Sequence, residues 1–281
     1  MTKNLDNQPI MTKNLDKVGL KSIVNDYDLF FIDLWGVIHN GVEVYENSLE
    51  VLNQLNSINK EYVLLTNAPR PSSNVKNFLE KMGINKEIAS RVYSSGEAAL
   101  EHLLKNKDKY FFHIGPPRDC DLFKSFEDKK VSEIKDAEYL LCTGLFDEHN
   151  KDLNYYETFL EPHLKKNMIC TNPDLIVDRG NTREYCAGSI ARLFDQIGGE
   201  VEYFGKPYAK IYNQATKVEN KKILCIGDNL NTDIRGANLQ CYDSLLIANG
   251  VHKKEIEIGG TLNVFIKYSV SVDYIQSSLK W

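Results

Sequence analysis

Short apolar runs that end in polar residues alternate with amphipathic stretches along the first part of the chain. The run Leu29–Ile32 leads into Asp33, and the run 62–65 leads into Thr66. Between the two runs, residues 49–58 place an apolar side chain at every third position. Short apolar runs are typical of buried strands, and the three-residue spacing is typical of a helix. Strands separated by helices predict an α/β fold with a parallel sheet and right-handed crossovers.

A second amphipathic stretch follows these runs and supports the same fold class. Val75, Phe78, Leu79 and Met82 fall at positions i, i+3, i+4 and i+7, and Gly83 comes directly after them. This spacing puts four apolar side chains on one face of a helix, and glycine is common just after a helix end. The predicted order is therefore strand, helix, strand, helix.

The pattern of strands and helices restarts near residue 106, and strands like those of the first part resume near residue 223. We therefore predict an α/β domain of residues 106–200, inserted into a core domain that consists of residues 17–105 and 201–281. The hexapeptide Met-Thr-Lys-Asn-Leu-Asp occurs twice within residues 1–16. Two copies at a period of ten are too short to be a structural repeat, so we predict a disordered arm there.

Several polar residues follow apolar runs, where a parallel sheet would bind its ligands. Asp33 and Thr66 follow the first two runs, and Asp228 follows a third run late in the chain. Asp233 lies five residues after Asp228, and Lys206 stands between a glycine and a proline. Ligands of open α/β sheets bind at the carboxyl ends of the strands, so we expect these side chains to meet. Carboxylates suit a hard cation, and a lysine and a hydroxyl suit a phosphate group.

These residues occur in the order and spacing of the four motifs of the haloacid dehalogenase-like superfamily of phosphotransferases. Leu-Leu-Thr-Asn at 64–67, Thr-Asn-Pro-Asp at 171–174 and Gly-Lys-Pro at 205–207 resemble its capped, NagD-type phosphatases of sugar and nucleotide phosphates. The resemblance covers residues 29–250. It implies a Rossmann-like core, in which helices flank a parallel sheet, and an inserted α/β cap domain that determines substrate specificity.

The resemblance implies a role for each of the motif residues. Asp33 would attack the phosphoryl group and form an aspartyl phosphate, while Thr66 and Lys206 would stabilise the transferring group. Asn67 would also hydrogen-bond to this group. Arg70, in the same loop, would either pair with a second anionic group of the substrate or be only a surface residue at a helix start. Specificity residues are expected in this loop and in the cap segment 174–188.

The resemblance further implies a Mg²⁺ site. The ligands would be Asp33, Asp228 and the main-chain carbonyl of Trp35, and Asp233 would hold a metal-bound water or Lys206. Every residue type offers the same carbonyl, so Trp35 is expected to leave metal binding intact.

Trp35 departs from the family pattern, because the superfamily's phosphatases normally have an aspartate at this position. That aspartate protonates the leaving alcohol and then activates water, which contributes about 10²–10⁴-fold in rate. An indole does not titrate. Three alternatives follow: hydrolysis persists at a reduced rate, His39 takes over the proton transfer, or the protein binds a phosphorylated ligand with little turnover. Trp35 itself either contacts the substrate or only closes the site against water.

The sequence thus predicts a Mg²⁺-dependent phosphatase that acts on a small phosphate ester through an aspartyl-phosphate intermediate. The main alternative is a catalytically weakened protein on the same scaffold that binds a phosphorylated metabolite or has a regulatory role. Phosphoryl transfer to an acceptor other than water is a third possibility.

Charge and hydropathy narrow the expected partners. The formal net charge is −5 at pH 7, and neither sign forms a long block, which argues against a nucleic-acid partner. No apolar run approaches the roughly 20 residues of a membrane span, and no apolar signal core follows the N-terminus. We therefore expect a cytoplasmic protein whose partner is a small phosphorylated metabolite, without nucleic acid or membrane. A homodimer that forms through the cap is a further expectation from the resemblance.

Overall fold

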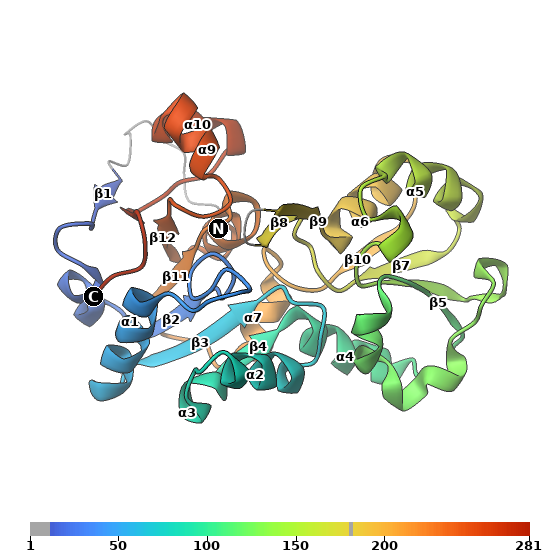
Figure 1. Ribbon diagram of the computed structural model, residues 1–281, viewed down its shortest axis with the longest axis horizontal. Helices are drawn as coiled ribbons and strands as arrows, with labels where there is room; N and C mark the ends of the chain where they lie inside the picture. Colours follow the sequence, from blue (N-terminus) through green and yellow to red (C-terminus); the bar gives the residue numbers. More distant parts are fainter. Residues whose placement is uncertain (1–11, 180–181) are drawn as a thin grey trace.

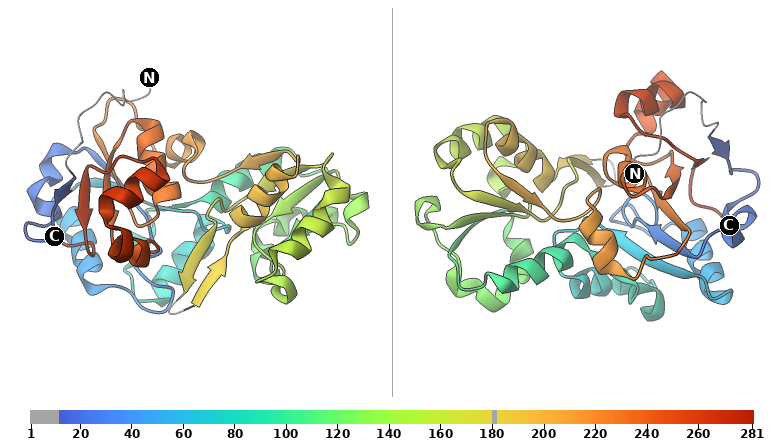
Figure 2. Two further views of the ribbon diagram at one scale, coloured as in Figure 1. Left: turned by 90° about the horizontal axis from the view of Figure 1, so that it is seen from above. Right: turned by 180° about the vertical axis from the view of Figure 1, so that it is seen from behind.

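The computed structural model describes residues 12–179 and 182–281, which form two lobes connected by several chain segments (Figure 1). The larger lobe combines the segments nearest the two ends of the chain, and the smaller lobe is formed by the middle of the chain. The two further views in Figure 2 show the lobes side by side along the long axis. None of the helices in the described ranges is long and apolar enough to cross a membrane.

The larger lobe is built on a seven-stranded sheet in which every pair of neighbouring strands is parallel. In spatial order its strands are β1 (Lys13–Asn14), β13 (Tyr274–Gln276), β12 (Asp243–Ile247), β11 (Ile223–Gly227), β2 (Leu29–Ile32), β3 (Glu61–Thr66) and β4 (Val92–Ser94). The central strands β2 and β11 are buried along their whole length, as expected for strands covered on both faces.

Helices cover both faces of this sheet, because successive side chains of a strand point to opposite faces. Phe30 and Ile32 share a hydrophobic cluster with α1 and α2, whereas Leu29 and Phe31 share another with α4 and α7. The helices of this lobe are α1 (Glu46–Ser57), α2 (Ser72–Lys81), α3 (Lys86–Ala89), α4 (Ser95–Lys105), α7 (Ala209–Ala215), α8 (Arg235–Gln240), α9 (Lys253–Gly259) and α10 (Thr261–Tyr268).

The smaller lobe is a four-stranded parallel sheet with two helices on one face. Its strands, in spatial order, are β10 (Val201–Tyr203), β7 (Asn167–Cys170), β6 (Tyr139–Cys142) and β5 (Phe111–Ile114), and its helices are α5 (Leu153–Leu160) and α6 (Ala187–Gln196). An antiparallel hairpin, β8 (Ile176–Arg179) and β9 (Thr182–Tyr185), projects from it toward the larger lobe (Figure 1). We call these two strands the cap hairpin.

Short 3₁₀ turns and one π-helical turn complete the described secondary structure. They lie at Leu20–Ser22, Val24–Asp26, Pro117–Leu122, Lys124–Lys129, Ile134–Asp136, Asp147–His149, Glu161–His163 and, for the π-turn, Leu230–Ile234. The predicted fold class, a Rossmann-like parallel sheet flanked by helices with an additional α/β cap, is confirmed. The domain boundaries stay a prediction. Because β10 pairs with β7 of the smaller sheet, we propose moving the second boundary from residue 200 to the residues just after 203.

The predicted arm is wrong for its last five residues. β1 extends the large sheet by pairing with β13, and Leu15 is fully buried. The main-chain N–H and the hydroxyl of Ser277 both donate to the carboxylate of Asp16, at 2.7 and 2.8 Å. Without β1, β13 would be the edge strand of the sheet and would expose unpaired main-chain groups. β1 pairs with those groups. Residues 1–11 lie outside the described residues.

The register of the central strands brings the candidate residues together. Ile32 of β2 lies opposite Ile226 of β11 on one side and Leu64 of β3 on the other. The three strands therefore end side by side, and the main-chain N–H of Asp33 still donates to the carbonyl of Ile226 at 2.8 Å. Asp33, Thr66 and Asp228 consequently lie at one edge of the sheet.

Candidate active site

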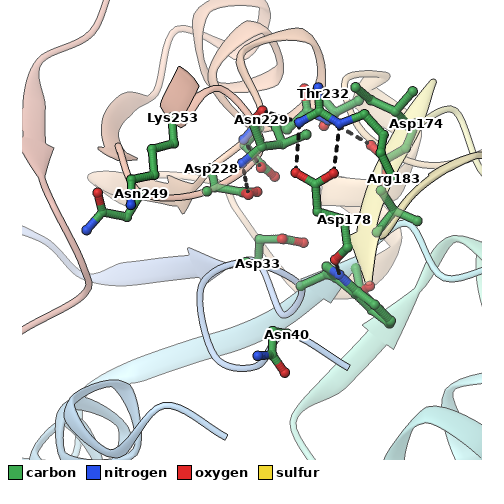
Figure 3. Close-up of a pocket in the computed structure, with 18 of the residues that line it drawn as sticks. Asp33, Asn40, Asp174, Asp178, Arg183, Asp228, Asn229, Thr232, Asn249 and Lys253 are labelled. Carbon is green, nitrogen blue, oxygen red and sulfur yellow. Dashed lines mark hydrogen bonds and ion pairs between the residues drawn. The ribbon is translucent and has the colours of Figure 1, made fainter. Parts of the chain in front are cut away.

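A cavity of about 550 Å³ lies between this edge of the sheet and the cap hairpin (Figure 3). Five of the predicted residues line its floor, and we call them the core wall: Asp33, Thr66, Lys206, Asp228 and Asp233. The cap hairpin closes the opposite side with Ile176, Val177, Asp178 and Arg183. Residues from the core loops complete the lining: Trp35, Gly36, Asn40, Tyr45, Asn229, Thr232, Asn249, Gly250, Val251, Lys253 and Lys254, together with Asp174 from the segment before the hairpin.

Lys206 joins two of the carboxylates of the core wall. Its ammonium donates to Asp33 at 2.6 Å, to Asp233 at 2.7 Å and to the main-chain carbonyl of Leu65 at 2.8 Å. Three acceptors use all three donors of the ammonium group. Burial alone would lower the pKa of Lys206, but the carboxylates of Asp233 and Asp33 outweigh it and raise the pKa above its usual value. The lysine is therefore a fixed positive charge beside Asp33.

Three carboxylates of the core wall lie close enough to share a cation. Oxygen atoms of Asp33, Asp228 and Asp233 lie within 4.8 Å of one another, and all three residues are buried. Burial raises the pKa of Asp33 to about 7, against the opposing effect of Lys206. Burial and the neighbouring Asp33 raise the pKa of Asp228 well above its usual range. The single positive charge of Lys206 does not balance the negative charges of three carboxylates. The carboxylate oxygens therefore fit a divalent cation that prefers oxygen ligands.

Two glycines let the main chain approach the carboxylate of Asp228. A Cβ atom at Gly36 or at Gly250 would collide with this carboxylate. Gly36 also has φ +80°, a conformation that other residues rarely adopt. Gly36 thus lies beside Asp228, and the predicted metal ligand, the carbonyl of Trp35, belongs to the residue directly before it. That use of the carbonyl stays a prediction, as do the other assigned roles.

Asn67 lies behind the core wall rather than in it. Its side-chain oxygen accepts from the main-chain N–H of Lys206 at 2.7 Å, and its amide donates to the carbonyl of the same residue at 3.0 Å. The amide also donates to Asp174 at 3.1 Å. Asn67 is 2% exposed and does not line the cavity, and its hydrogen bonds position Lys206 and Asp174; its contact with the phosphoryl group stays a prediction. Thr66 does line the cavity, as predicted.

Asp174 is a site residue that we did not predict individually. It ends the Thr-Asn-Pro-Asp segment and begins the cap segment 174–188, in which we expected specificity residues. Its carboxylate accepts from the side-chain amides of Asn67 and Asn229, and burial raises its pKa to about 6. The signal in the sequence was the second Thr-Asn pair. It directly follows strand β7, just as the first Thr-Asn pair lies at the end of strand β3.

Trp35 connects the core to the cap hairpin. Its indole N–H donates to the main-chain carbonyl of Asp178 at 2.6 Å, and its ring lies edge-on to His39. Arg183 reinforces the same contact, since it donates twice to the carboxylate of Asp178, at 2.7 and 2.8 Å, and once to the carbonyl of Val251 at 2.9 Å. The indole therefore lines the cavity and holds the hairpin over the core wall.

Two residues considered from the sequence are placed elsewhere. Arg70 does not line the cavity, and its guanidinium donates to Asp119 at 2.9 Å, so the structure places it away from the core wall and its role as a substrate contact stays a prediction. Asp119 lies in the first 3₁₀ turn after β5 and is 3% exposed. A buried carboxylate needs a neighbouring positive charge, and Arg70 supplies it. His39 is 2% exposed, does not line the cavity, and accepts from the N–H of Gly41. Burial lowers the pKa of His39 to about 4, which does not suit a general acid at neutral pH.

Comparison with known proteins assigns this arrangement to a family. The sequence model of the haloacid dehalogenase-like hydrolase family matches residues 30–127, and a second, HAD-like hydrolase model matches residues 203–264. The chain belongs to the haloacid dehalogenase-like hydrolases. The two matched segments contain Asp33, Thr66 and Lys206 together with Asp228 and Asp233, so the resemblance stated from the motifs is confirmed.

Relatives of this hydrolase cover almost the whole chain. A 4-nitrophenylphosphatase of Schizosaccharomyces pombe is 25% identical over 84% of this chain and 88% of its own length. The 5'-nucleotidase YutF of Bacillus subtilis is 24% identical over 82% of this chain and 90% of its own. A haloacid dehalogenase-like hydrolase structure from Brucella suis 1330 superimposes with a TM-score of 0.80 at 29% identity, and the match covers 93% of this chain and 98% of that one. The prediction of a capped, NagD-type member is confirmed.

Proposed function

We propose that this hydrolase is a Mg²⁺-dependent phosphatase that acts on a small phosphate ester through an aspartyl phosphate on Asp33. The strongest support is the position of the Asp33 carboxylate. It lies at the end of a central strand, faces an open cavity, and is held by a lysine beside two further carboxylates. Relatives named as a 4-nitrophenylphosphatase and a 5'-nucleotidase support the same reaction class.

The side chains of the core wall suit a two-step displacement. Lys206 holds one carboxylate oxygen of Asp33, and the other carboxylate oxygen attacks the phosphorus atom. The bond between the phosphorus atom and the leaving oxygen breaks in the same step. Water then attacks the phosphorus of the aspartyl phosphate, which releases inorganic phosphate and restores the carboxylate. Mg²⁺, when bound by Asp33, Asp228 and the Trp35 carbonyl, supplies the charge that lets an anionic nucleophile approach an anionic phosphoryl group.

Trp35 limits which esters this site hydrolyses well. The indole donates to Asp178 and has no proton that it could give to a leaving alkoxide. The leaving oxygen must then depart unprotonated or take its proton from water. We therefore expect a steep dependence of rate on the pKa of the leaving alcohol, with aryl phosphates hydrolysed faster than alkyl phosphates.

The test is phosphate release from a panel of aryl, sugar and nucleotide monophosphates, with Mg²⁺ and with a chelator. We expect Mg²⁺-dependent release that falls by about 10³-fold or more in Asp33→Asn, because the amide is not a nucleophile. Asp28→Asn serves as the matched control, since Asp28 directly precedes the same strand, is exposed, and accepts from the N–H of Lys222. Unchanged phosphate release in Asp33→Asn would rule out the aspartyl phosphate.

A second function is favoured by one observation, the indole of Trp35 in the cavity. In this alternative the protein binds a phosphorylated metabolite on the same residues without productive turnover. Its signature is Mg²⁺-dependent binding of a panel ester, measured by calorimetry, with no phosphate released over hours. Release of the leaving alcohol that appears only after an acceptor alcohol is added, together with a new phosphate ester and no inorganic phosphate, would instead indicate phosphoryl transfer to that acceptor.

A further inference from the structure

Two adjacent lysines line the outer part of the cavity. Lys253 and Lys254 begin α9, and both are exposed. Within the described residues, neither ammonium group forms an ion pair. The acid next to them in the sequence, Glu255, is already engaged by Lys267 at 2.8 Å and by the hydroxyl of Tyr268 at 3.0 Å. The cavity therefore contains two positive charges that no residue in the described ranges neutralises through an ion pair.

The main chain holds these lysines in a fixed relation to the core wall. The N–H of Val251 donates to the carboxylate of Asp228 at 2.8 Å, and a Cβ atom at Gly250 would collide with the same carboxylate. The N–H of Lys253 donates to the carbonyl of Gly250 at 3.0 Å. The loop that carries the two lysines is thus anchored on a predicted metal ligand, two residues before the first lysine.

The other cation in the outer cavity has a partner. Arg183 is paired through two hydrogen bonds with Asp178, and its remaining contact is to the carbonyl of Val251. In Figure 3 this pair and Lys253 lie on different sides of Asp228. Among the described lining residues of the outer cavity, the positive charges left for an entering anionic group are therefore those of Lys253 and Lys254.

We propose that Lys253 and Lys254 bind a second anionic group on the leaving-group side of the substrate. The substrate class is then phosphate monoesters that carry a carboxylate or a second phosphate, a conclusion that rests on the proposed phosphatase function. The phosphoryl group itself is placed against Lys206 and the metal site, so the two lysines are left for the rest of the molecule. Ammonium groups suit either anion, because they bind as point charges without a required planar geometry.

The experiment compares matched esters that differ in this second charge. One pair is 3-phosphoglycerate and glycerol 3-phosphate, and the other is fructose 1,6-bisphosphate and fructose 6-phosphate. The measured quantity is the ratio of kcat/KM for the more charged ester to that for its partner, at low and at high salt. The variant is Lys253→Gln with Lys254→Gln. Lys107→Gln with Lys109→Gln, two exposed lysines that do not line the cavity, is the control of equal net charge.

We expect a ratio well above one in the unchanged protein for at least one pair, and that pair identifies the anion as carboxylate or phosphate. The lysine variant should lower this ratio about tenfold, as two partly solvated charge pairs would, and high salt should lower it too. The control should leave it unchanged. A ratio near one, or an equal fall for both esters of a pair, would overturn the inference, since the lysines would then act on the phosphoryl group common to both.

Failure of the proposed function is a separate outcome. If no ester is hydrolysed, the phosphatase proposal fails. The role of the lysines is then tested by the ratio of the two dissociation constants within each pair, that of the less charged ester divided by that of the more charged ester. These are measured by calorimetry with Mg²⁺ for the same esters and variants. Equal dissociation constants within each pair would refute the role of the lysines, and a Kd ratio that falls in the lysine variant would support it without any turnover.

Discussion

The core wall and the cap hairpin face each other across one cavity, but they are held in different ways. The residues of the core wall are buried at strand ends and in the loops that follow, where backbone and side-chain hydrogen bonds fix them; Lys206 alone makes three. The cap hairpin is partly exposed, and its described contacts with the core include the hydrogen bonds from Trp35 to Asp178 and from Arg183 to Val251. The core wall is therefore suited to a reaction that needs side chains in fixed positions. The contacts of the hairpin are instead suited to forming and breaking as substrate enters.

Among the variants that test this contrast, the largest effect should come from disturbing the core wall without removing any of its side chains. Gly250→Ala introduces a methyl group that collides with the Asp228 carboxylate and must displace it. We expect the Mg²⁺ concentration needed for half-maximal phosphate release to rise and kcat/KM to fall by about 10²-fold, the usual size of a loss caused by a small misplacement. Phosphate release as a function of Mg²⁺ concentration measures both quantities.

Gly259→Ala is the matched control. It lies at the end of α9, and a Cβ atom there meets only Val264, at an ordinary 3.7 Å. If Gly250→Ala behaved like this control, the carboxylate of Asp228 would not have to stay where the structure places it, and the rigidity of the core wall would be refuted.

A smaller effect is expected from loosening the cap hairpin. Trp35→Phe keeps an aromatic ring against His39 but removes the N–H that donates to the carbonyl of Asp178. One hydrogen bond of this kind contributes about 0.5–1.5 kcal/mol, so kcat/KM should fall by about three- to tenfold, mainly through KM. Steady-state kinetics on the best ester of the panel give the two parameters separately.

Trp281→Phe controls for the loss of an indole, because Trp281 lies at the C-terminus and does not line the cavity. A large loss of kcat with unchanged KM in Trp35→Phe would mean that the indole takes part in the chemical step. The contact between the indole and the hairpin would then affect the chemical step itself, as the residues of the core wall do.

The same contrast explains how far the sequence could be read. Three residues of the core wall follow apolar runs, so these runs predicted that Asp33, Thr66 and Asp228 would meet at a sheet edge. The cap hairpin has no such signal, since β9 is mostly exposed. Its contacts with Trp35 and Val251 join residues more than 60 positions apart. The arm was misjudged for a related reason: β1 has two exposed residues, and only its pairing with β13 makes it a strand.

The smallest effect on catalysis should come from Arg70, which the sequence suggested as a substrate contact. Its guanidinium lies outside the cavity and pairs with the buried Asp119, so Arg70→Ala should leave KM unchanged for every ester of the panel. Loss of the pair, in which the arginine is about one-third exposed, should destabilise the fold by about 1 kcal/mol, or about 2–4 °C in Tm. Arg118→Ala is the matched control, because its pair with Asp147 is more than half exposed on both sides and should contribute less to Tm. A raised KM specific to esters with a second anionic group would instead place Arg70 at the substrate, and would require the loop after β3 to turn toward the cavity when substrate binds.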